Sequence, residues 1–126
     1  MNVFSYTFNV AGVTFKNRQR YIYYIIQNPN AYLMFHREKT NEFDKNAIRV
    51  IAKVPDGKCV TLGYVPKDIA AKIAPLVDKN YDISAKGYTI TGGKYYNRGV
   101  KVNITVYPKR QKMKNIFKEE NQNVKA

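Results

Sequence analysis

Two segments of this chain, residues 3–10 and 100–107, alternate between apolar and polar residues. In residues 3–10 the alternate residues on one side are Phe4, Tyr6, Phe8 and Val10. In residues 100–107 they are Val100, Val102, Ile104 and Val106. A period of two sends alternate side chains to opposite faces of an extended chain. The two segments therefore predict half-buried β-strands, each of which needs neighbouring strands to pair with.

Four further segments between these two predict strands, because each is rich in β-branched or aromatic residues and bounded by turn residues. They are residues 31–37, 46–54, 58–65 and 81–91. The tripeptide Pro55-Asp56-Gly57 predicts the hairpin turn between the second and third of them. Gly92-Gly93 ends the last, and residues 94–99 are expected to form a loop.

Two segments have helical periodicity. The first covers residues 18–27, with Asn17 expected to cap it and with apolar residues at Tyr21, Ile22, Ile25 and Ile26. The second begins at Pro66, which suits a first helical turn. Its apolar face consists of Ile69, Ala70, Ile73, Leu76 and Val77. Pro75 is expected to kink or shorten this helix.

Six short strands and two helices predict a mainly β fold. We expect a small six-stranded barrel, similar to the oligonucleotide-binding type, because closure removes exposed strand edges. The length of 126 residues suits one domain. We place this domain at residues 1–108, and we expect residues 109–126 to be a basic, flexible tail.

The charge is the most unusual property of the composition. Lys and Arg number 22 against 9 Asp and Glu, which gives a net charge of +13. A globular chain this basic is expected to meet a polyanion, meaning nucleic acid or an anionic membrane surface. The 11 Tyr residues favour nucleic acid, because bases stack on exposed rings while cations contact phosphates.

Cys59 and His36 each occur once. A disulfide within the chain is therefore excluded, and a zinc site made by this chain alone is not expected. We expect no cofactor, and we expect Cys59, in an apolar strand, to be a small core residue. Neither a signal-peptide pattern nor a membrane-spanning apolar run is present, so a cytoplasmic protein is predicted.

The polar turn between two predicted strands offers Phe43, Asp44, Lys45 and Asn46 in succession. Such a turn can hold a nucleotide, with the ring on a base, the cation at a phosphate and the carboxylate at a sugar hydroxyl. Other roles remain open at this stage. Asp44 can accept backbone N–H groups within the turn, and Phe43 can be a core residue.

Two other segments mix rings with cations. Lys16, Arg18 and Arg20 follow Phe15, and the loop after Gly93 contains Lys94, Tyr95, Tyr96, Asn97 and Arg98. Both are candidates for contacts with phosphates or bases. Phe15 can equally pack beneath the sheet, and Lys67 and Lys72 can simply be solvated cations on a helix face.

Three blocks, in this order, resemble the HIRAN domain family. They are residues 8–15 with 17–19, residues 33–38 with 41–50, and residues 62–66 with 69–70. The resemblance covers about residues 4–107. It implies a modified oligonucleotide-binding barrel that, at the front of eukaryotic DNA-remodelling helicases, captures the 3′ end of single-stranded DNA. Bacterial and phage members are often small free-standing proteins.

Carried onto this chain, the resemblance implies a pocket with two rings, Phe15 and Phe43. It implies that Asp44 binds the terminal 3′ hydroxyl and that Lys67 contacts a phosphate. Tyr64 occupies a position where a His can serve, and Tyr95 or Tyr96 is implied as a cover for the end base. Thr14 stands where the helicase members have Arg, and Glu42-Phe43 stands where they have Pro-Tyr.

The function expected from the charge, the rings and the resemblance is nonenzymatic binding of nucleic acid. Single-stranded DNA is the expected ligand, with its 3′-hydroxyl end a possible target, in a DNA-repair setting. The alternative is a protein-interaction domain that binds an acidic partner protein. A nuclease is the weakest reading, because the few acids form no paired metal constellation.

Overall fold

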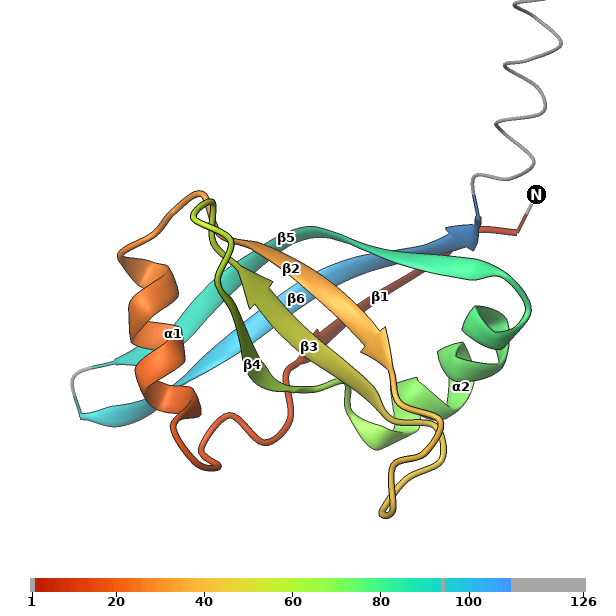
Figure 1. The fold of residues 1–126 in the computed structure, drawn as a ribbon, viewed down its shortest axis with the longest axis horizontal. Coiled ribbons are helices and arrows are strands. Elements are labelled where there is room, and N and C mark those ends of the chain that lie inside the picture. Colours follow the sequence, from red (N-terminus) through yellow and green to blue (C-terminus); the bar gives the residue numbers. More distant parts are fainter. Residues whose placement is uncertain (1, 94, 110–126) are drawn as a thin grey trace, which may run out of the picture.

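The computed structural model describes residues 2–93 and 95–109. They form six strands and two helices (Figure 1). The strands are β1 (Phe4–Asn9), β2 (Tyr32–Arg37), β3 (Ile48–Lys53), β4 (Cys59–Tyr64), β5 (Tyr81–Gly93) and β6 (Tyr96–Pro108). The helices are α1 (Arg18–Ile26) and α2 (Lys67–Asp78). The mainly β fold with six strands and two helices is therefore confirmed. The tail expected from residue 109 lies outside the described residues from residue 110 onward.

The strands make two antiparallel three-stranded sheets, in the orders β1-β6-β5 and β2-β3-β4. The two sheets cross one another, with β2, β3 and β4 drawn over β1, β5 and β6 (Figure 1). They join where β1 ends, because Ala11 and Tyr64 form an isolated bridge. Its two backbone hydrogen bonds are Ala11 N to Tyr64 O at 2.8 Å and Tyr64 N to Ala11 O at 2.9 Å.

A closed barrel was expected, and the described residues do not form one. β2 is bonded only to β3 and β5 only to β6, so no ladder joins β2 to β5. A groove of about 500 Å³ runs between these two edges. A side chain spans it at one end, where the Tyr88 hydroxyl donates to the Ala31 carbonyl at 3.1 Å.

The core lies between the sheets and is built by the expected alternation. The inward residues of β6 are all buried, namely Val100, Val102, Ile104 and Val106. Ile22 and Ile25 of α1 are buried at one end of the sheets, and Ile73 of α2 at the other. Burial of these apolar side chains is the main favourable term that holds the two sheets together.

Both helices differ from expectation at one residue. Asn17 precedes α1, but its side chain makes no capping hydrogen bond; its backbone carbonyl accepts from Tyr21 N at 3.1 Å. Pro75 lies inside α2, which continues past it to Asp78, so the helix does not end at Pro75 as a shortened helix would; a kink there stays a prediction. Pro75 cannot donate to the carbonyl of Ala71, but Ala71 is exposed, so water can satisfy that oxygen.

Two expectations about the strands were wrong. Cys59 is exposed rather than in the core, because it pairs with Lys53 on the outward face of the sheet, whereas the next residue, Val60, pairs with the buried Ala52. The segment 94–99 was expected to be a loop, yet β6 already begins at Tyr96, which pairs with Gly93. Within the described ranges, no helix is both long and apolar enough to cross a membrane.

Candidate nucleic-acid interface

One open pocket of about 520 Å³ lies where the two sheets join. Its lining comes from the loop after β1, the loop between β2 and β3, the end of β4 and the start of α2. Seven residues of the ten predicted for the site line it: Phe15, Lys16, Arg18, Phe43, Asp44, Tyr64 and Lys67. The structure thus brings together residues up to 52 positions apart in the sequence, from Phe15 to Lys67.

The loop between β2 and β3 presents Phe43 to solvent. The Asn41 side-chain oxygen accepts from the backbone N–H groups of Phe43 at 2.8 Å and Asp44 at 3.0 Å. An Asn that binds the N–H groups two and three residues ahead fixes a tight turn. The Phe43 ring at the top of this turn is 91% exposed. A core role for Phe43 is therefore wrong, and its ring is free to stack on a planar ligand.

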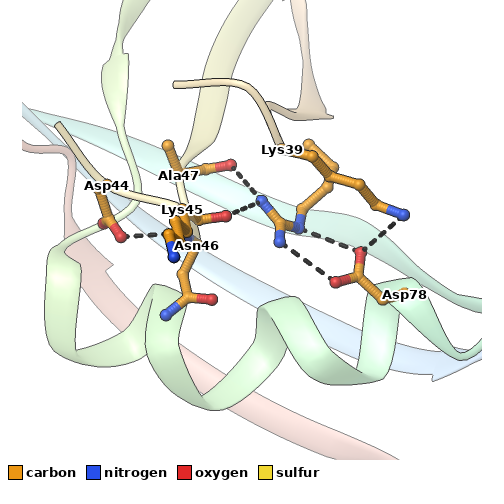
Figure 2. Close-up of polar contacts among 7 residues, drawn as sticks. Lys39, Asp44, Lys45, Asn46, Ala47 and Asp78 are labelled. Carbon is orange, nitrogen blue, oxygen red and sulfur yellow. Dashed lines mark hydrogen bonds and ion pairs between the residues drawn. The ribbon is translucent and has the colours of Figure 1, made fainter. Parts of the chain in front are cut away.

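Asp44 has one oxygen engaged within the turn. Its Oδ1 accepts from Asn46 N at 2.9 Å, as Figure 2 shows. The backbone-acceptor role considered for Asp44 is therefore confirmed. Its Oδ2 has no hydrogen bond to any residue in the described part of the chain, so this oxygen remains available to accept from a ligand hydroxyl.

Arg37 at the end of β2 holds the far side of the same loop. Its Nη1 donates to the carbonyls of Lys45 at 2.7 Å and Ala47 at 3.3 Å. Its Nε and Nη2 donate to the two oxygens of Asp78, at 3.2 and 3.1 Å. The guanidinium thereby ties the loop to the last residue of α2.

Asp78 also forms an ion pair with Lys39 of the same loop, whose Nζ lies 3.7 Å from Asp78 Oδ1 (Figure 2). The hydrogen bonds from Arg37, and secondarily the charge of Lys39, hold the pKa of Asp78 below its ordinary value. Asp78 therefore stays ionised, and the clamp on the loop stays charged, over the neutral range.

The other wall of the pocket is formed by Phe15 and two cations. The Arg18 guanidinium lies 5.3 Å from the Phe15 ring centroid and 5.7 Å from that of Tyr64. Lys16 Nζ lies 5.6 Å from the Phe15 ring. These distances are within the range of cation–π attraction. Arg18 also donates to the Gly12 carbonyl at 2.9 Å, which fixes its position.

Phe15 is 59% exposed, so it does not pack beneath the sheet. Gly12 has a positive φ of 78°, and a Cβ there would lie 2.8 Å from Arg18 Nη1. The positive φ favours glycine here, and a Cβ would require the end of the flexible Arg18 side chain to shift. Arg18 supplies a cation to the pocket, whereas the uncharged Thr14 does not line it.

Tyr64 lies at the floor of the pocket with its hydroxyl already committed. The hydroxyl donates to Glu38 Oε1 at 2.9 Å, and Asn41 Nδ2 donates to the same oxygen at 3.1 Å. Arg49 Nε is 3.1 Å from Glu38 Oε2 but is not aligned for a hydrogen bond, so that contact is an ion pair. Glu38, Asn41 and Arg49 were not predicted as site residues.

The pKa values of this network follow from burial and pairing. Burial by itself would raise the pKa of Glu38, but the hydrogen bonds from Asn41 and Tyr64, with the charge of Arg49, outweigh it and lower the pKa. Burial, and next the bond to Glu38, raises the pKa of the Tyr64 phenol. Glu38 is therefore an anion and Tyr64 a neutral phenol at neutral pH.

Three predicted residues lie outside this pocket: Tyr95, Tyr96 and Arg98. They belong to the end of the β5–β6 hairpin, which lies near α1 (Figure 1). The side chain of Gln19 holds Arg98 there, because it donates to Arg98 O at 2.7 Å and accepts from Arg98 N at 2.8 Å. Nothing in this arrangement brings Tyr95 or Tyr96 over the pocket.

Comparison with known proteins identifies the class to which this fold and pocket belong. Residues 3–109 match the HIRAN domain, so the chain belongs to the HIRAN domain family. It is also similar to a protein described as Fanconi-associated nuclease 1 homolog from Arabidopsis thaliana, with 34% identity over 79 residues. That similarity covers 63% of this chain and 8% of the plant protein. No solved structure matches the chain.

Proposed function

We propose that this protein is a nonenzymatic module that binds the end of a single strand of DNA in the pocket between Phe15 and Phe43. The observation that carries the proposal is the convergence of two exposed rings, one carboxylate and three cations on one open volume of about 520 Å³. The cations are Lys16, Arg18 and Lys67. Membership of the HIRAN family supports nucleic acid as the ligand.

The chemistry of the pocket suits one terminal nucleotide with its phosphate. A base can stack on the exposed face of Phe43 or Phe15, because every base offers a π-face to a ring. Arg18 and Lys67 can neutralise the phosphates that follow, and such pairing makes binding fall with rising salt. Tyr64 supplies a ring rather than a donor, since its hydroxyl proton is directed to Glu38.

The free Oδ2 of Asp44 is the feature that would distinguish a strand end from a strand interior. A terminal sugar hydroxyl can donate to a carboxylate, whereas a phosphate at the same place brings negative charge against it. Glu42 lies next to Phe43 and is exposed, so it adds to this repulsion of anions. We therefore propose that the pocket prefers a 3′-hydroxyl end to a 3′-phosphate end.

Fluorescence anisotropy with a 12-nucleotide oligo-dT at low salt tests the proposal. We expect Phe43→Ala to weaken binding by about 1–3 kcal/mol, the usual loss for one stacked base. Tyr32→Ala is the matched control, because Tyr32 is a half-exposed ring on β2 that does not line the pocket. Equal losses in the two variants, or no binding of wild type, would refute the proposal.

The end preference has its own test in the same assay. Asp44→Asn keeps an oxygen that can accept from Asn46 N and removes only the charge. We expect wild type to bind the 3′-hydroxyl strand more tightly than the 3′-phosphate strand, and Asp44→Asn to bind both equally. Wild-type affinities that do not differ would remove the role of Asp44. We also expect a labelled strand to stay intact with Mg²⁺ or Mn²⁺, and cleavage lost in Asp44→Ala would contradict nonenzymatic binding.

A further inference from the structure

The acidic residues of the described chain are confined to part of the fold. Residues 2–37 and the described residues from 83 to 109 contain neither Asp nor Glu. These ranges include β1, the whole of α1, and almost all of the β5–β6 hairpin. The acids lie instead in the loop after β2, in the β3–β4 turn, in α2 and at the start of β5. Neither α1 nor the described part of the hairpin from residue 83 onward therefore carries an acidic residue of its own.

A second ring–cation pair lies between α1 and the hairpin. The Arg98 guanidinium is 5.3 Å from the Tyr23 ring centroid, and the Tyr23 side chain is 49% exposed. The reciprocal hydrogen bonds between Gln19 and the Arg98 backbone fix the hairpin against α1. Gln19 and Tyr23 are four residues apart, so they share one face of the helix. The pair is held by the fold rather than by a chance surface contact.

The surface beside this pair is concave. A groove of about 640 Å³ is lined by Ile26 and Pro29 on one side and by Tyr88, Ile90 and Arg98 on the other, with no acidic residue. Tyr96, at the start of β6, is 79% exposed. Aromatic and apolar surface with a single fixed cation suits a stacked base next to a phosphate.

α1 connects this second surface to the pocket. Arg18, the first residue of α1, lines the pocket, and Gln19 follows it directly and bonds Arg98. Tyr23 lies five residues beyond Arg18, which is ~7.5 Å along a helix axis. Tyr23 is therefore more than one turn along α1 from Arg18 and on another side of the helix, so the strand would reach it by passing round α1 over its next few nucleotides. Single-strand-binding proteins built on oligonucleotide-binding folds contact ~4–16 nucleotides per fold, far more than one pocket accommodates.

Resting on the function proposed above, we propose that Tyr23 and Arg98 form a second binding surface for the body of the strand whose end is in the pocket. The occupant is single-stranded nucleic acid that continues along α1 to the β5–β6 hairpin. The pocket selects the end, and Tyr23 with Arg98 adds affinity that depends on strand length. Tyr23 stacks on a base, and Arg98 contacts a phosphate.

Two probes of different length separate the surfaces: the dinucleotide d(TT) and a 12-nucleotide oligo-dT, both with 3′-hydroxyl ends. We expect Tyr23→Ala to weaken binding of the 12-mer about 5- to 150-fold, the range for one stacked base, and to leave the dinucleotide unchanged. Tyr32→Ala is the matched control, since Tyr32 is 50% exposed against 49% for Tyr23 but lies on β2. Phe43→Ala should weaken both probes.

Arg98→Gln provides an independent variant that leaves the ring of Tyr23 and the backbone bonds to Gln19 in place. Loss of one phosphate contact should reduce the magnitude of the salt slope for the 12-mer by about 0.7. Lys58→Gln, in the exposed β3–β4 turn, is the matched control. Thermal melting of each variant checks the fold. If Tyr23→Ala lowers the melting temperature, the salt slope of Arg98→Gln is the result that supports or refutes the second binding surface.

The outcomes separate this inference from the proposed function. If wild type binds neither probe, the proposed function fails. If wild type binds both probes with equal affinity, or if Tyr23→Ala binds the 12-mer as Tyr32→Ala does, the second surface is refuted while the pocket stands. A Tyr23→Ala variant that weakens both probes equally also refutes it, because Tyr23 would then act through the pocket.

Discussion

The hydroxyl of Tyr64 donates to Glu38 across 2.9 Å, so the residue at the floor of the pocket offers a ligand its ring and not its proton. The same ring lies 5.7 Å from the Arg18 guanidinium. The hydrogen bond to Glu38 and the cation–π contact with Arg18 therefore hold the Tyr64 ring in place, and Tyr64 has no hydroxyl proton left for a ligand. The cationic contacts with a phosphate fall to Arg18, Lys16 and Lys67, which line the same volume.

Tyr64→Phe tests this division of roles. The substitution keeps the ring under Arg18 and removes the bond to Glu38. We expect a loss of stability of about 1 kcal/mol, typical of one hydrogen bond, with affinity for single-stranded DNA close to that of wild type. Arg18→Gln should show the opposite pattern, with lower affinity and a flatter salt dependence. Chemical denaturation and anisotropy measure the two quantities, and a Tyr64→Phe variant that folds normally but no longer binds DNA would contradict the assignment.

Glu38 makes stability depend on pH in a definite direction. Its pKa in the folded protein is below the ordinary value of 4.5, so the unfolded chain takes up the proton first as the pH falls. The contribution of Glu38 to stability is therefore complete above its ordinary pKa and is lost as the pH falls through the lowered value. We expect Glu38→Gln to be less stable than wild type at neutral pH and to approach it as the pH falls below 4.5.

Denaturant titrations at several pH values measure this effect. Asp78 also has a lowered pKa and contributes acid sensitivity with the same sign. Asp78→Asn is therefore the necessary companion variant, and the double variant should show the flattest pH profile. A Glu38→Gln profile parallel to that of wild type would show that Glu38 has the same pKa in both states.

Arg37 acts on the site only through the loop that carries Phe43 and Asp44. Its side chain is 13% exposed and bonds two loop carbonyls together with Asp78. Lys lacks the planar fork, so Arg37→Lys cannot keep all of these bonds. We expect the free energy of unfolding to fall by about 1–3 kcal/mol and the affinity for single-stranded DNA to fall as well. If Arg37→Lys raises amide exchange over wild type more at residues 43–47 than at β6, the loop has lost its position without general unfolding. An equal rise at both places would argue against a positioning role for Arg37.

The strands and the core were predictable because a period of two fixes which side chains share a face. Cys59 was placed in the core because its strand is apolar, but the period of two puts it on the outward face with Lys53 once Val60 and Leu62 take the inward positions. Pro75 was expected to disturb α2, but the effect depends on whether water reaches the carbonyl of Ala71. The exposure of the Ala71 residue to water depends on how α2 packs, so it cannot be derived from the local sequence around Pro75.

The pocket was predictable to the extent that it rests on local turns and a family resemblance. Phe43 and Asp44 lie in a polar turn that is evident in the sequence, and Asn41 stabilises it because an Asn side chain often accepts from the backbone N–H two residues ahead. Tyr95 and Tyr96 were implied to cover the end base, but a pair of residues 79 positions apart, Gln19 and Arg98, holds their hairpin beside α1. Contacts at such separation follow from the packing of the whole chain and not from local pattern.

The junction of the two sheets depends on the absence of a side chain at Gly63. A Cβ at this position would lie 2.1 Å from the Ala11 carbonyl oxygen and 2.8 Å from Val10. That carbonyl accepts one of the two hydrogen bonds of the Ala11–Tyr64 bridge, so the backbone must move and the bridge must open. The pocket lies at this junction, and both Ala11 and Tyr64 line it.

We therefore expect Gly63→Ala to destabilise the fold by more than about 3 kcal/mol, beyond the range of most single substitutions. Gly87→Ala is the matched control, because a Cβ there has no atom within 4 Å. It should change stability by no more than about 0.5 kcal/mol, as expected of a surface substitution. Thermal and denaturant unfolding compare the two variants. If Gly63→Ala were as stable as Gly87→Ala, the close contact between Ala11 and Gly63 would not be needed to hold the two sheets together at the pocket.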